Sequence, residues 1–322
     1  MSSGDSTAPS LPRAAGEGRG GELCDDPGAF LATLLPEPAA PACPKAIFLV
    51  APDGFRRAED SARDNRYMAA ADAFAGDRAQ AQHRALQQAL AAQLPAVCFP
   101  GDPATPDAVF PNNVFATAPG RYLVGHMRHP VRQREAGRRD IPAFFEQVLG
   151  YRRVDLRLQG GVCELTGSLV IDRARGLGFA GLSERCDLAG AAAMHAGFGL
   201  ARTLRFALAP GEYHTNVVMS VLASRAVVLW PAGFADPGVP AAIAALYAPH
   251  VVELDAAEAG AFAGNCLAVT PETVWMSERA ADALRPASRA ALERAGFRVV
   301  AVPLDAIEAG GGSLRCCLGE IY

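Results

Sequence analysis

The C-terminal stretch Gly310-Gly311-Gly312-Ser313-Leu314-Arg315-Cys316-Cys317-Leu318-Gly319-Glu320 places a thiol directly after a glycine run and beside an arginine. Glycine has no Cβ and tolerates positive φ, so such a run lets the backbone approach a ligand closely. Nearby positive charge favours the thiolate, which is the reactive form of cysteine. The stretch therefore predicts an active-site thiol, Cys316, at the end of a strand.

Composition limits the classes of protein to consider. The chain has 322 residues, 50% of them hydrophobic, and a formal net charge of −4, so no basic surface for nucleic acid is indicated. No apolar stretch reaches membrane-spanning length, and the N-terminus lacks a basic segment followed by an apolar run. The eight cysteines form no C-x-x-C pair and no regular disulfide framework, which favours a reducing compartment. We expect a cytoplasmic protein without a membrane or nucleic-acid partner. The composition leaves a homo-oligomer open.

Two regions are expected along the chain. Residues 1–44 are rich in Ser, Gly, Pro, Ala and acidic residues and predict a flexible N-terminal tail with one short turn at 29–34. From residue 45 to residue 322, strand-like and helix-like patterns alternate, which is typical of a single α/β domain. The predicted strands are 46–50, 122–125, 168–172, 217–222, 226–230, 251–254, 273–276 and 297–302, and the predicted helices are 77–94, 141–149, 239–247 and 286–295.

Other chemistry-bearing residues stand at element boundaries. Asp107, Asn112 and Asn113 lie in a Pro-punctuated loop, which turn chemistry alone would also produce. Glu164 lies among glycines before a strand, where it either binds a cation and moves protons or is a solvated loop acid. His214 heads an apolar strand, although a lone histidine is more often a structural hydrogen bonder.

Two further features have less specific interpretations. Gly264-Asn265 before an apolar run is either a structural turn or the lining of a pocket. His126 and His129 lack a carboxylate or thiol that would complete a metal site, so no metal is expected. A thiol, a histidine and a carboxylate at element boundaries make a Cys-His-Glu hypothesis.

Taken in order, the motifs resemble the guanidino-group modifying, or pentein, superfamily, and most of all its citrulline hydrolase branch, which is related to the arginine deiminases. The segments are P-D-A-V-F-P-N-N from Pro106, E-x-T-G-S from Glu164, Y-H-T-N-V from Tyr213 and G-G-G-S-x-R-C from Gly310, and the resemblance covers roughly residues 45–322. It implies an α/β fold, a five-bladed pentein propeller with pseudo-fivefold symmetry around a central active site. Strand–helix alternation alone would have favoured a doubly wound sheet.

The resemblance also implies roles for residues. Cys316 would be the nucleophile, His214 the general acid/base and Glu164 the carboxylate that holds a substrate nitrogen. The substrate-binding residues would be Asp107, Asn112, Asn113, Asn216, Gly311, Gly312, Ser313 and Arg315. No metal or organic cofactor is needed, and the partner is a small guanidino or ureido compound.

Three positions depart from the family pattern. Ala51 occupies the place of an arginine expected after the first strand, so a substrate α-carboxylate is either not recognised or recognised by a residue elsewhere. Leu165 replaces a glycine after the acid. Cys317 adjoins Cys316, but period-two alternation would aim the two thiols at opposite faces.

The implied reaction has two steps. A guanidinium or urea carbon is a poor electrophile, so a covalent adduct on Cys316 splits one difficult step into two easier ones. Because an unperturbed thiol has a pKa of about 8.5, Arg315, His214 or a cationic substrate must favour the thiolate. His214 would protonate the departing nitrogen and then deprotonate a water.

The neutral amides Asn113 and Asn216 stand where guanidinium-binding relatives commonly carry aspartates. An amide offers both a donor and an acceptor, which matches a neutral urea better than a cation. We therefore expect citrulline to be hydrolysed to ornithine, ammonia and carbon dioxide. An arginine deiminase or dimethylargininase, an amidinotransferase and a non-catalytic binding protein remain alternatives, whereas a papain-like signature is absent.

Overall fold

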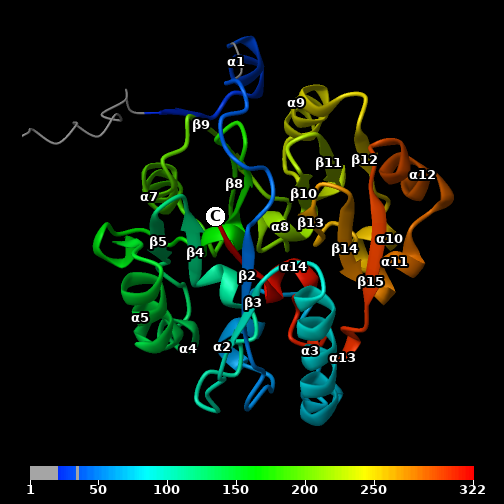
Figure 1. The fold of residues 1–322 in the computed structure, drawn as a ribbon. Coiled ribbons are helices and arrows are strands. Elements are labelled where there is room, and N and C mark those ends of the chain that lie inside the picture. The colour runs from blue at the N-terminus through cyan, green and yellow to red at the C-terminus, as the bar shows by residue number, and fades with distance from the viewer. Residues whose placement is uncertain (1–20, 34–35) are drawn as a thin grey trace, which may run out of the picture.

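The computed structural model describes residues 21–33 and 36–322, and its short sheets and helices surround a common centre (Figure 1). The strands are β1 (Glu22–Cys24), β2 (Ala46–Val50), β3 (Ala96–Phe99), β4 (Phe115–Ala118), β5 (Arg121–Val124), β6 (Arg152–Asp155), β7 (Leu169–Asp172), β8 (Leu177–Leu182), β9 (Arg202–Ala207), β10 (Met219–Leu222), β11 (Ala226–Leu229), β12 (Val251–Glu253), β13 (Leu267–Thr270), β14 (Thr273–Ser277), β15 (Arg298–Val302) and β16 (Gly319–Ile321).

The helices lie between these strands and around their rim. The α-helices are α1 (Pro27–Ala32), α2 (Glu59–Ala62), α3 (Gly76–Ala91), α4 (Pro130–Gln133), α5 (Asp140–Ala143), α6 (Leu165–Ser168), α7 (Leu188–Phe198), α8 (Thr215–Val218), α9 (Gly238–Tyr247), α10 (Ala256–Gly260), α11 (Glu278–Ala283), α12 (Pro286–Arg294), α13 (Asp305–Glu308) and α14 (Leu314–Cys317). The short 3₁₀ and π turns are η1 (Ala71–Ala73), η2 (Pro111–Asn113), η3 (Glu135–Gly137), η4 (Phe144–Val148), η5 (Leu156–Leu158) and η6 (Pro231–Gly233).

The described strands form five sheets that repeat one pattern. In each sheet an antiparallel pair is followed by a parallel third strand. We name them blade 1 (β16, β2, β3), blade 2 (β4, β5, β6), blade 3 (β7, β8, β9, with β1 on its edge), blade 4 (β10, β11, β12) and blade 5 (β13, β14, β15). Blade 1 combines strands from both ends of the chain, because β16 pairs with β2.

Apolar clusters join each blade to its neighbours and close the ring. Each cluster contains residues of two neighbouring blades: Phe48 and Phe115 for blades 1 and 2, Leu123 and Leu169 for 2 and 3, Phe179 and Val227 for 3 and 4, Val228 and Val274 for 4 and 5, and Trp275 and Ile47 for 5 and 1. Five such interfaces complete a circle. The structure is therefore the five-bladed α/β arrangement that the resemblance implied.

Local sequence explains where several elements begin and end. The longest helix, α3, buries Ala79, His83, Leu86 and Leu90 at helical spacing. Asp255 and Glu258 form a capping box at the start of α10, which satisfies free backbone N–H groups of that helix.

Some boundaries differ from the sequence expectations. The predicted strands 168–172 and 217–222 begin slightly too early, because α6 ends at Ser168 and α8 runs through Val218 before β10 begins. The predicted helix 141–149 is divided into α5 and the π turn η4. Within the expected tail, residues 1–20 and 34–35 lie outside the described residues, whereas β1 pairs with β9 and Phe30 of α1 is buried.

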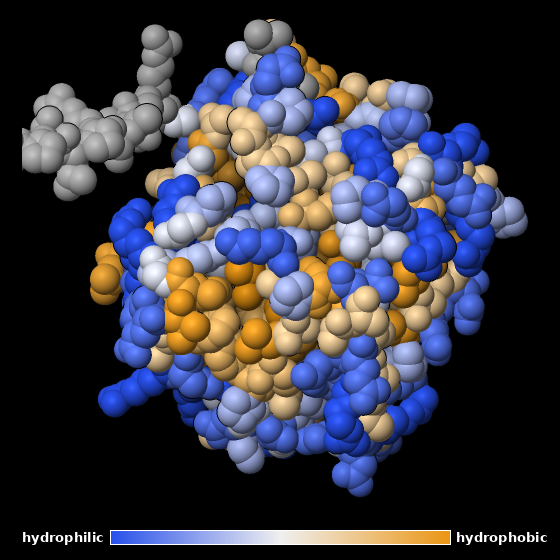
Figure 2. Space-filling view, in the orientation of Figure 1, coloured by the Kyte–Doolittle hydropathy of each residue, from blue (hydrophilic) through white to orange (hydrophobic). Residues whose placement is uncertain are grey.

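The surface seen in Figure 2 is mostly polar, with an apolar area across the middle of that face. Among the described residues, no helix combines the length and apolarity that crossing a membrane requires.

Candidate active site

The segment before the first strand of a blade carries the polar residues of the centre. A short turn precedes the first strand of four blades, namely α14 before β16, η2 before β4, α6 before β7 and α8 before β10. These turns carry Cys316, Asn113, Glu164 (which immediately precedes α6) and His214 (which immediately precedes α8). The turns touch one another, since α6 contacts η2 and α8, and α14 contacts η2. The repeated fold thus brings together residues that are far apart in the sequence, such as Asn113 and Cys316.

A narrow cavity opens at this centre. It is lined by Ser61, Asn65, Met68, Asp107, Phe110, Asn113, Arg132, Arg185, Tyr213, His214, Gly310, Gly312 and Cys316. Five of the residues singled out in the sequence line it: Asp107, Asn113, His214, Gly312 and Cys316.

Cys316 lies in the helical turn α14, before β16, and not at the end of a strand as expected. Gly311 adopts φ +78°, a conformation that favours glycine, and turns the chain into α14. Asn265 donates from Nδ2 to the sulfur at 3.3 Å. Burial raises the pKa of the Cys316 thiol, so the thiol form predominates in the unliganded site.

The neighbouring Cys317 points elsewhere. Its Sγ faces the backbone oxygen of Ser313 at 3.4 Å, and it packs in the apolar cluster between blades 5 and 1. Burial raises its pKa well above the ordinary value. Only Cys316 of this pair reaches the cavity.

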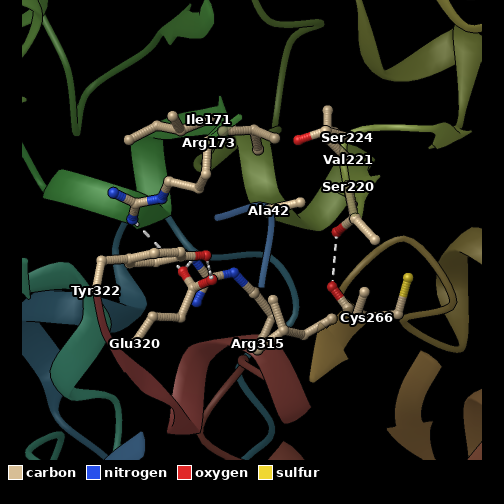
Figure 3. Close-up of a pocket in the computed structure, with 14 residues that line it drawn as sticks. Ala42, Ile171, Arg173, Ser220, Val221, Ser224, Cys266, Arg315, Glu320 and Tyr322 are labelled. Atoms are coloured by element: carbon tan, nitrogen blue, oxygen red, sulfur yellow. Dashed lines mark hydrogen bonds and ion pairs between the residues drawn. The ribbon is translucent and has the colours of Figure 1, made fainter. Parts of the chain in front are cut away.

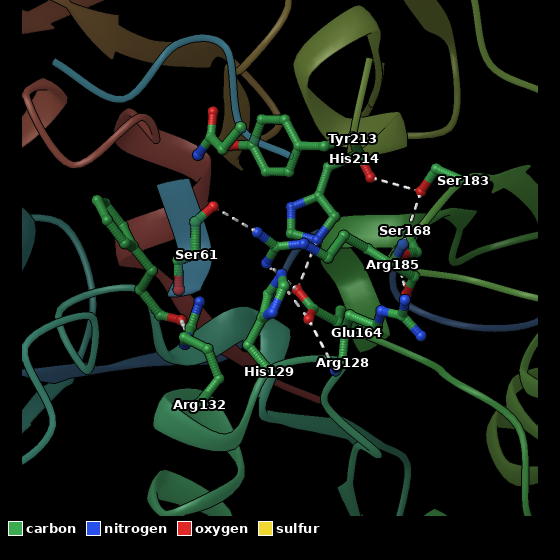
Figure 4. A network of polar contacts seen from close by, with 12 residues as sticks. Ser61, Arg128, His129, Arg132, Glu164, Ser168, Ser183, Arg185, Tyr213 and His214 are labelled. Atoms are coloured by element: carbon green, nitrogen blue, oxygen red, sulfur yellow. Dashed lines mark hydrogen bonds and ion pairs between the residues drawn. The ribbon is translucent and has the colours of Figure 1, made fainter. Parts of the chain in front are cut away.

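His214 and Glu164 form a buried pair (Figure 4). His214 Nε2 lies 2.9 Å from Glu164 Oε2, and Arg128 donates its backbone N–H to the other carboxylate oxygen at 3.2 Å. Burial alone would raise the pKa of Glu164, but the Arg185 guanidinium and the hydrogen bond with His214 hold it well below its usual range. Because an ionised carboxylate only accepts, His214 Nε2 carries the proton.

The other ring nitrogen of His214 is consequently the unprotonated one. Burial lowers the pKa of His214 despite the carboxylate, so the ring is neutral near pH 7. Nδ1 is buried and has no partner among the described residues. His214 thus presents a free basic nitrogen in the region of Asn113 and Gly167, where a Cβ on Gly167 would lie 2.9 Å from Nδ1.

Glu164 does not line the cavity. Its carboxylate is engaged by His214, Arg128 and Arg185. The next residue, Leu165, adopts φ +28°, close to the left-handed region where a glycine would fit with less strain. The strained turn fixes Glu164 behind the imidazole.

Two arginines that sequence reasoning missed line the cavity. Arg185 is buried and bridges Asp64 (Nη2 to Oδ1, 2.5 Å) and Glu164 (Nη1 to Oε2, 3.1 Å). Arg132 donates from Nε and Nη2 to Glu135, at 2.7 and 3.0 Å, and from Nη2 to the backbone oxygen of Phe110. No hydrogen bond of Arg132 Nη1 is found among the described residues. No local motif marks these arginines, because tertiary folding alone brings them to the centre.

Asp107 and Asn113 supply free acceptor atoms. Ser61 donates to Asp107 Oδ2 at 2.6 Å, while Asp107 Oδ1 and Asn113 Oδ1 are buried without a partner among the described residues. Burial raises the pKa of Asp107, against the opposing charge of Arg132. These unpaired oxygens indicate a place for a polar ligand, because buried polar atoms normally find partners.

The remaining predicted binding residues do not line this cavity. Asn112 bonds with Thr166, Asn216 donates to the backbone of Thr166, Gly311 accepts from Tyr213, and Ser313 donates to Glu308. Arg315 faces a different cavity, where it pairs with Glu320 near Arg173 and Tyr322 (Figure 3). Arg315 therefore lies outside the cavity that Cys316 lines.

Known proteins share this fold. The N-terminal domain of ArgZ, a cyanobacterial arginine dihydrolase with bound substrate, superimposes with a TM-score of 0.74 at 20% identity, over 86% of this chain and 98% of that one. A dimethylarginine dimethylaminohydrolase carrying an S-methyl-L-thiocitrulline adduct gives a TM-score of 0.66 at 19% identity, over 86% and 99%. The chain thus has the pentein fold of these two proteins.

Sequence comparison assigns the family within that class. The family described as N,N dimethylarginine dimethylhydrolase, eukaryotic, matches residues 51–322, and the chain belongs to it. The N(G),N(G)-dimethylarginine dimethylaminohydrolase of Mycobacterium tuberculosis is 29% identical over 217 residues, which are 67% of each chain. The family places the chain among hydrolases of the guanidino group.

Proposed function

We propose that this protein hydrolyses the guanidino or ureido group of a free α-amino acid through a covalent adduct on Cys316. One observation carries the proposal: the thiol of Cys316, the free Nδ1 of His214 and the unpaired oxygens of Asp107 and Asn113 meet around a single cavity. A nucleophile, a base and hydrogen-bond acceptors for N–H groups are the components that attack on a nitrogen-bonded trigonal carbon needs.

The protonation state of His214 supports a two-step reaction. Because His214 is neutral with its proton on Nε2, Nδ1 takes the Cys316 proton as the sulfur attacks the trigonal carbon. The imidazolium, stabilised by the Glu164 carboxylate, returns that proton to the departing nitrogen. A water then gives a proton to Nδ1 and attacks the adduct, which releases the product and restores the thiol.

The α-carboxylate of the substrate has a place in the same cavity. Arg132 lines the cavity, and the N–H groups of its Nη1 donate to no described residue. Glu135 pairs with the Arg132 guanidinium and offsets its charge. A guanidinium binds carboxylates well because it presents several N–H donors in one plane. Arg132, rather than a residue near Ala51, would then select free amino acids.

For the reacting end, a ureido group fits the lining best, and citrulline is our proposed substrate. Of the two amides considered in the sequence, Asn113 lines the cavity and Asn216 does not. Asn113 offers a donor and an acceptor to a neutral urea. Burial raises the pKa of Asp107, which disfavours its ionised form and so weakens the preference of this carboxyl group for a cation.

A second candidate is hydrolysis of a methylated arginine. Membership of the dimethylarginine dimethylhydrolase family favours it, and so does the presence of a carboxyl group, Asp107, at the cavity. A cationic guanidinium favours the ionised form of Asp107, whereas burial raises the pKa of that carboxyl group. The ratio of kcat/KM for arginine-type substrates to that for citrulline should therefore rise with pH, since groups shared by both reactions cancel in the ratio.

The test is a substrate screen by product. Purified protein is incubated with citrulline, arginine, agmatine and methylated arginines, and ammonia, methylamines, citrulline and ornithine are quantified, with and without an added acceptor amine. Ornithine from citrulline supports the ureido proposal, and dimethylamine supports the second candidate. A product that appears only with the acceptor amine indicates a transferase, and no turnover of any of these compounds refutes the proposal.

Asn113→Asp tests the recognition argument itself. A carboxylate in place of the amide favours a cation, because hydrogen bonds between charged groups are about twice as strong as neutral ones. We expect kcat/KM for arginine to rise relative to citrulline by about tenfold, the equivalent of ~1.4 kcal/mol. An unchanged ratio in a folded variant would remove the reason for preferring a ureido substrate.

A further inference from the structure

Blade 5 also presents a polar residue to the centre, in the segment before its first strand, as the other blades do with Cys316, Asn113, Glu164 and His214. Asn265 stands directly before Cys266 and β13, and it is fully buried. The proposed chemistry leaves it without a role. Its side chain nevertheless lies closer to the reacting sulfur than any other polar side chain for which a contact is found.

The amide orientation of Asn265 follows from its partners. Nδ2 donates to the backbone oxygen of Asn216 at 2.8 Å, and a carbonyl oxygen only accepts, so the nitrogen must face that side. The amide group carries two hydrogens. The second is available to Cys316 Sγ, which lies 3.3 Å from the same nitrogen.

The backbone holds this amide rigidly. Phe262, a bulky residue at φ +67°, starts a tight turn that is closed by the hydrogen bond from Asn265 N to its carbonyl oxygen at 2.9 Å. Ser220 donates to the backbone oxygens of Gly264 and Cys266, each at 2.8 Å. Strained conformations of this kind persist where the surroundings enforce them, and they cluster at functional sites.

The turn is also joined directly to the nucleophile's own segment. Arg315 donates its backbone N–H to the Asn265 carbonyl oxygen at 3.3 Å, so the residue before Cys316 is tied to Asn265. A Cβ on Gly264 would lie 2.4 Å from the backbone oxygen of Val217, so the turn packs tightly against α8. The distance between the Asn265 amide and the sulfur is thereby fixed before any substrate binds.

We infer that Asn265 is a catalytic residue that stabilises the thiolate of Cys316 by donating one Nδ2 hydrogen to Sγ, an inference that rests on the proposed covalent function. A donor favours the charged sulfur over the neutral thiol. Burial raises the pKa of Cys316, and the hydrogen bond from Asn265 is the largest influence that opposes this increase. Arg315, whose guanidinium pairs with Glu320, contributes less.

The test measures the thiol without any substrate. In a Cys317→Ser background, the rate of iodoacetamide alkylation at Cys316 is followed by peptide mass spectrometry from pH 6 to 11. Asn265→Leu keeps a similar volume and removes the donor. We expect the alkylation midpoint to rise by about one pH unit, which lowers the rate about tenfold at pH values below the midpoint. An unchanged midpoint in a folded variant overturns the inference.

Asn216→Leu is the matched comparison, because Asn216 Nδ2 lies farther from the sulfur, at 3.8 Å. Its midpoint should shift less than that of Asn265→Leu. An equal or larger shift would contradict a specific role for Asn265. On any substrate that is turned over, Asn265→Leu should lower kcat and leave KM nearly unchanged, since Asn265 does not line the cavity.

A measurement on the unsubstituted side chain covers the case in which Asn265→Leu does not fold. With ¹⁵N-labelled asparagine, one side-chain amide resonance should titrate with the midpoint of Cys316 alkylation and lose this titration after alkylation. If no asparagine amide follows that midpoint, the inference fails. Absence of turnover on every guanidino and ureido compound would instead refute the proposed function, while the alkylation result would still stand.

Discussion

Two adjacent cysteines have different roles at the scale of single residues. Cys316 lines the cavity, whereas Cys317 faces the Ser313 carbonyl oxygen inside the apolar core. Cys316→Ser should therefore lower kcat by about 10⁴-fold or more and leave the unfolding temperature nearly unchanged. Cys317→Ser should retain most activity. Turnover and thermal unfolding of both variants, with haloacetamidine labelling located by mass spectrometry, check the assignment, and the reverse pattern would exchange the two roles.

The glutamate behind the imidazole offers a second test at this scale. Glu164→Gln removes the charge between His214 and Arg185, so that, of the two carboxylates that pair with this buried guanidinium, only Asp64 remains charged. Removing one partner of a buried ion pair costs about 3 kcal/mol. We expect that loss in chemical denaturation, together with a lower kcat because the imidazolium is less stabilised. Full activity would contradict the pairing that orients His214.

Sequence adjacency did not show that Arg315 and Cys316 face different cavities, and it gave no sign of Arg132 and Arg185. Successive residues of a helical turn point about 100° apart, so two neighbours need not share a cavity. Cys316, His214, Asp107 and Asn113 were recognisable because each stands in a local motif. Arg132 and Arg185 reach the centre only after separate blades pack together, which no short segment encodes.

At the scale of elements, the one-turn helices before the first strands position the catalytic side chains. The α6 turn carries Gly167, where a Cβ would lie 2.5 Å from Asn113 Oδ1 and 2.9 Å from His214 Nδ1. Hydrophobic pattern did not reveal these turns, since short apolar runs look alike in strands and buried helices. The sequence located the elements but not the turns that aim the side chains.

Gly167→Ala should consequently disturb chemistry more than folding. The added methyl group displaces His214 or Asn113, and a misplacement of about 1 Å can cost on the order of 100-fold in rate. Gly260→Ala, where a Cβ would meet nothing within 4 Å, is the matched control and should behave as the unsubstituted protein. Steady-state kinetics with circular dichroism distinguish the outcomes, and equal kcat in both variants would show that α6 tolerates the methyl group.

At the scale of the whole molecule, β16 closes the ring by pairing with β2 and follows α14 directly. A Cβ on Gly319 would lie 2.1 Å from the Phe48 ring. Gly319→Val should therefore weaken blade 1, lowering stability by about 1–3 kcal/mol through overpacking, and should also reduce activity through α14. Urea unfolding and turnover measure both effects, and Gly137→Ala, which meets no atom within 4 Å, should change neither.

The pH dependence of global stability depends on histidines kept neutral inside the fold. His83 on α3 is 2% exposed, and burial lowers its pKa to about 4 from an ordinary value of 6.5. In the unfolded chain the ring takes up a proton at higher pH, so folding stability falls as pH drops from 6.5 towards 4. The loss amounts to about 3 kcal/mol by proton linkage. His195 and His214, whose pKa values are also lowered, act in the same direction. The slope of the unfolding free energy against pH should flatten in His83→Gln, and an unaltered slope would place the acid sensitivity in other groups.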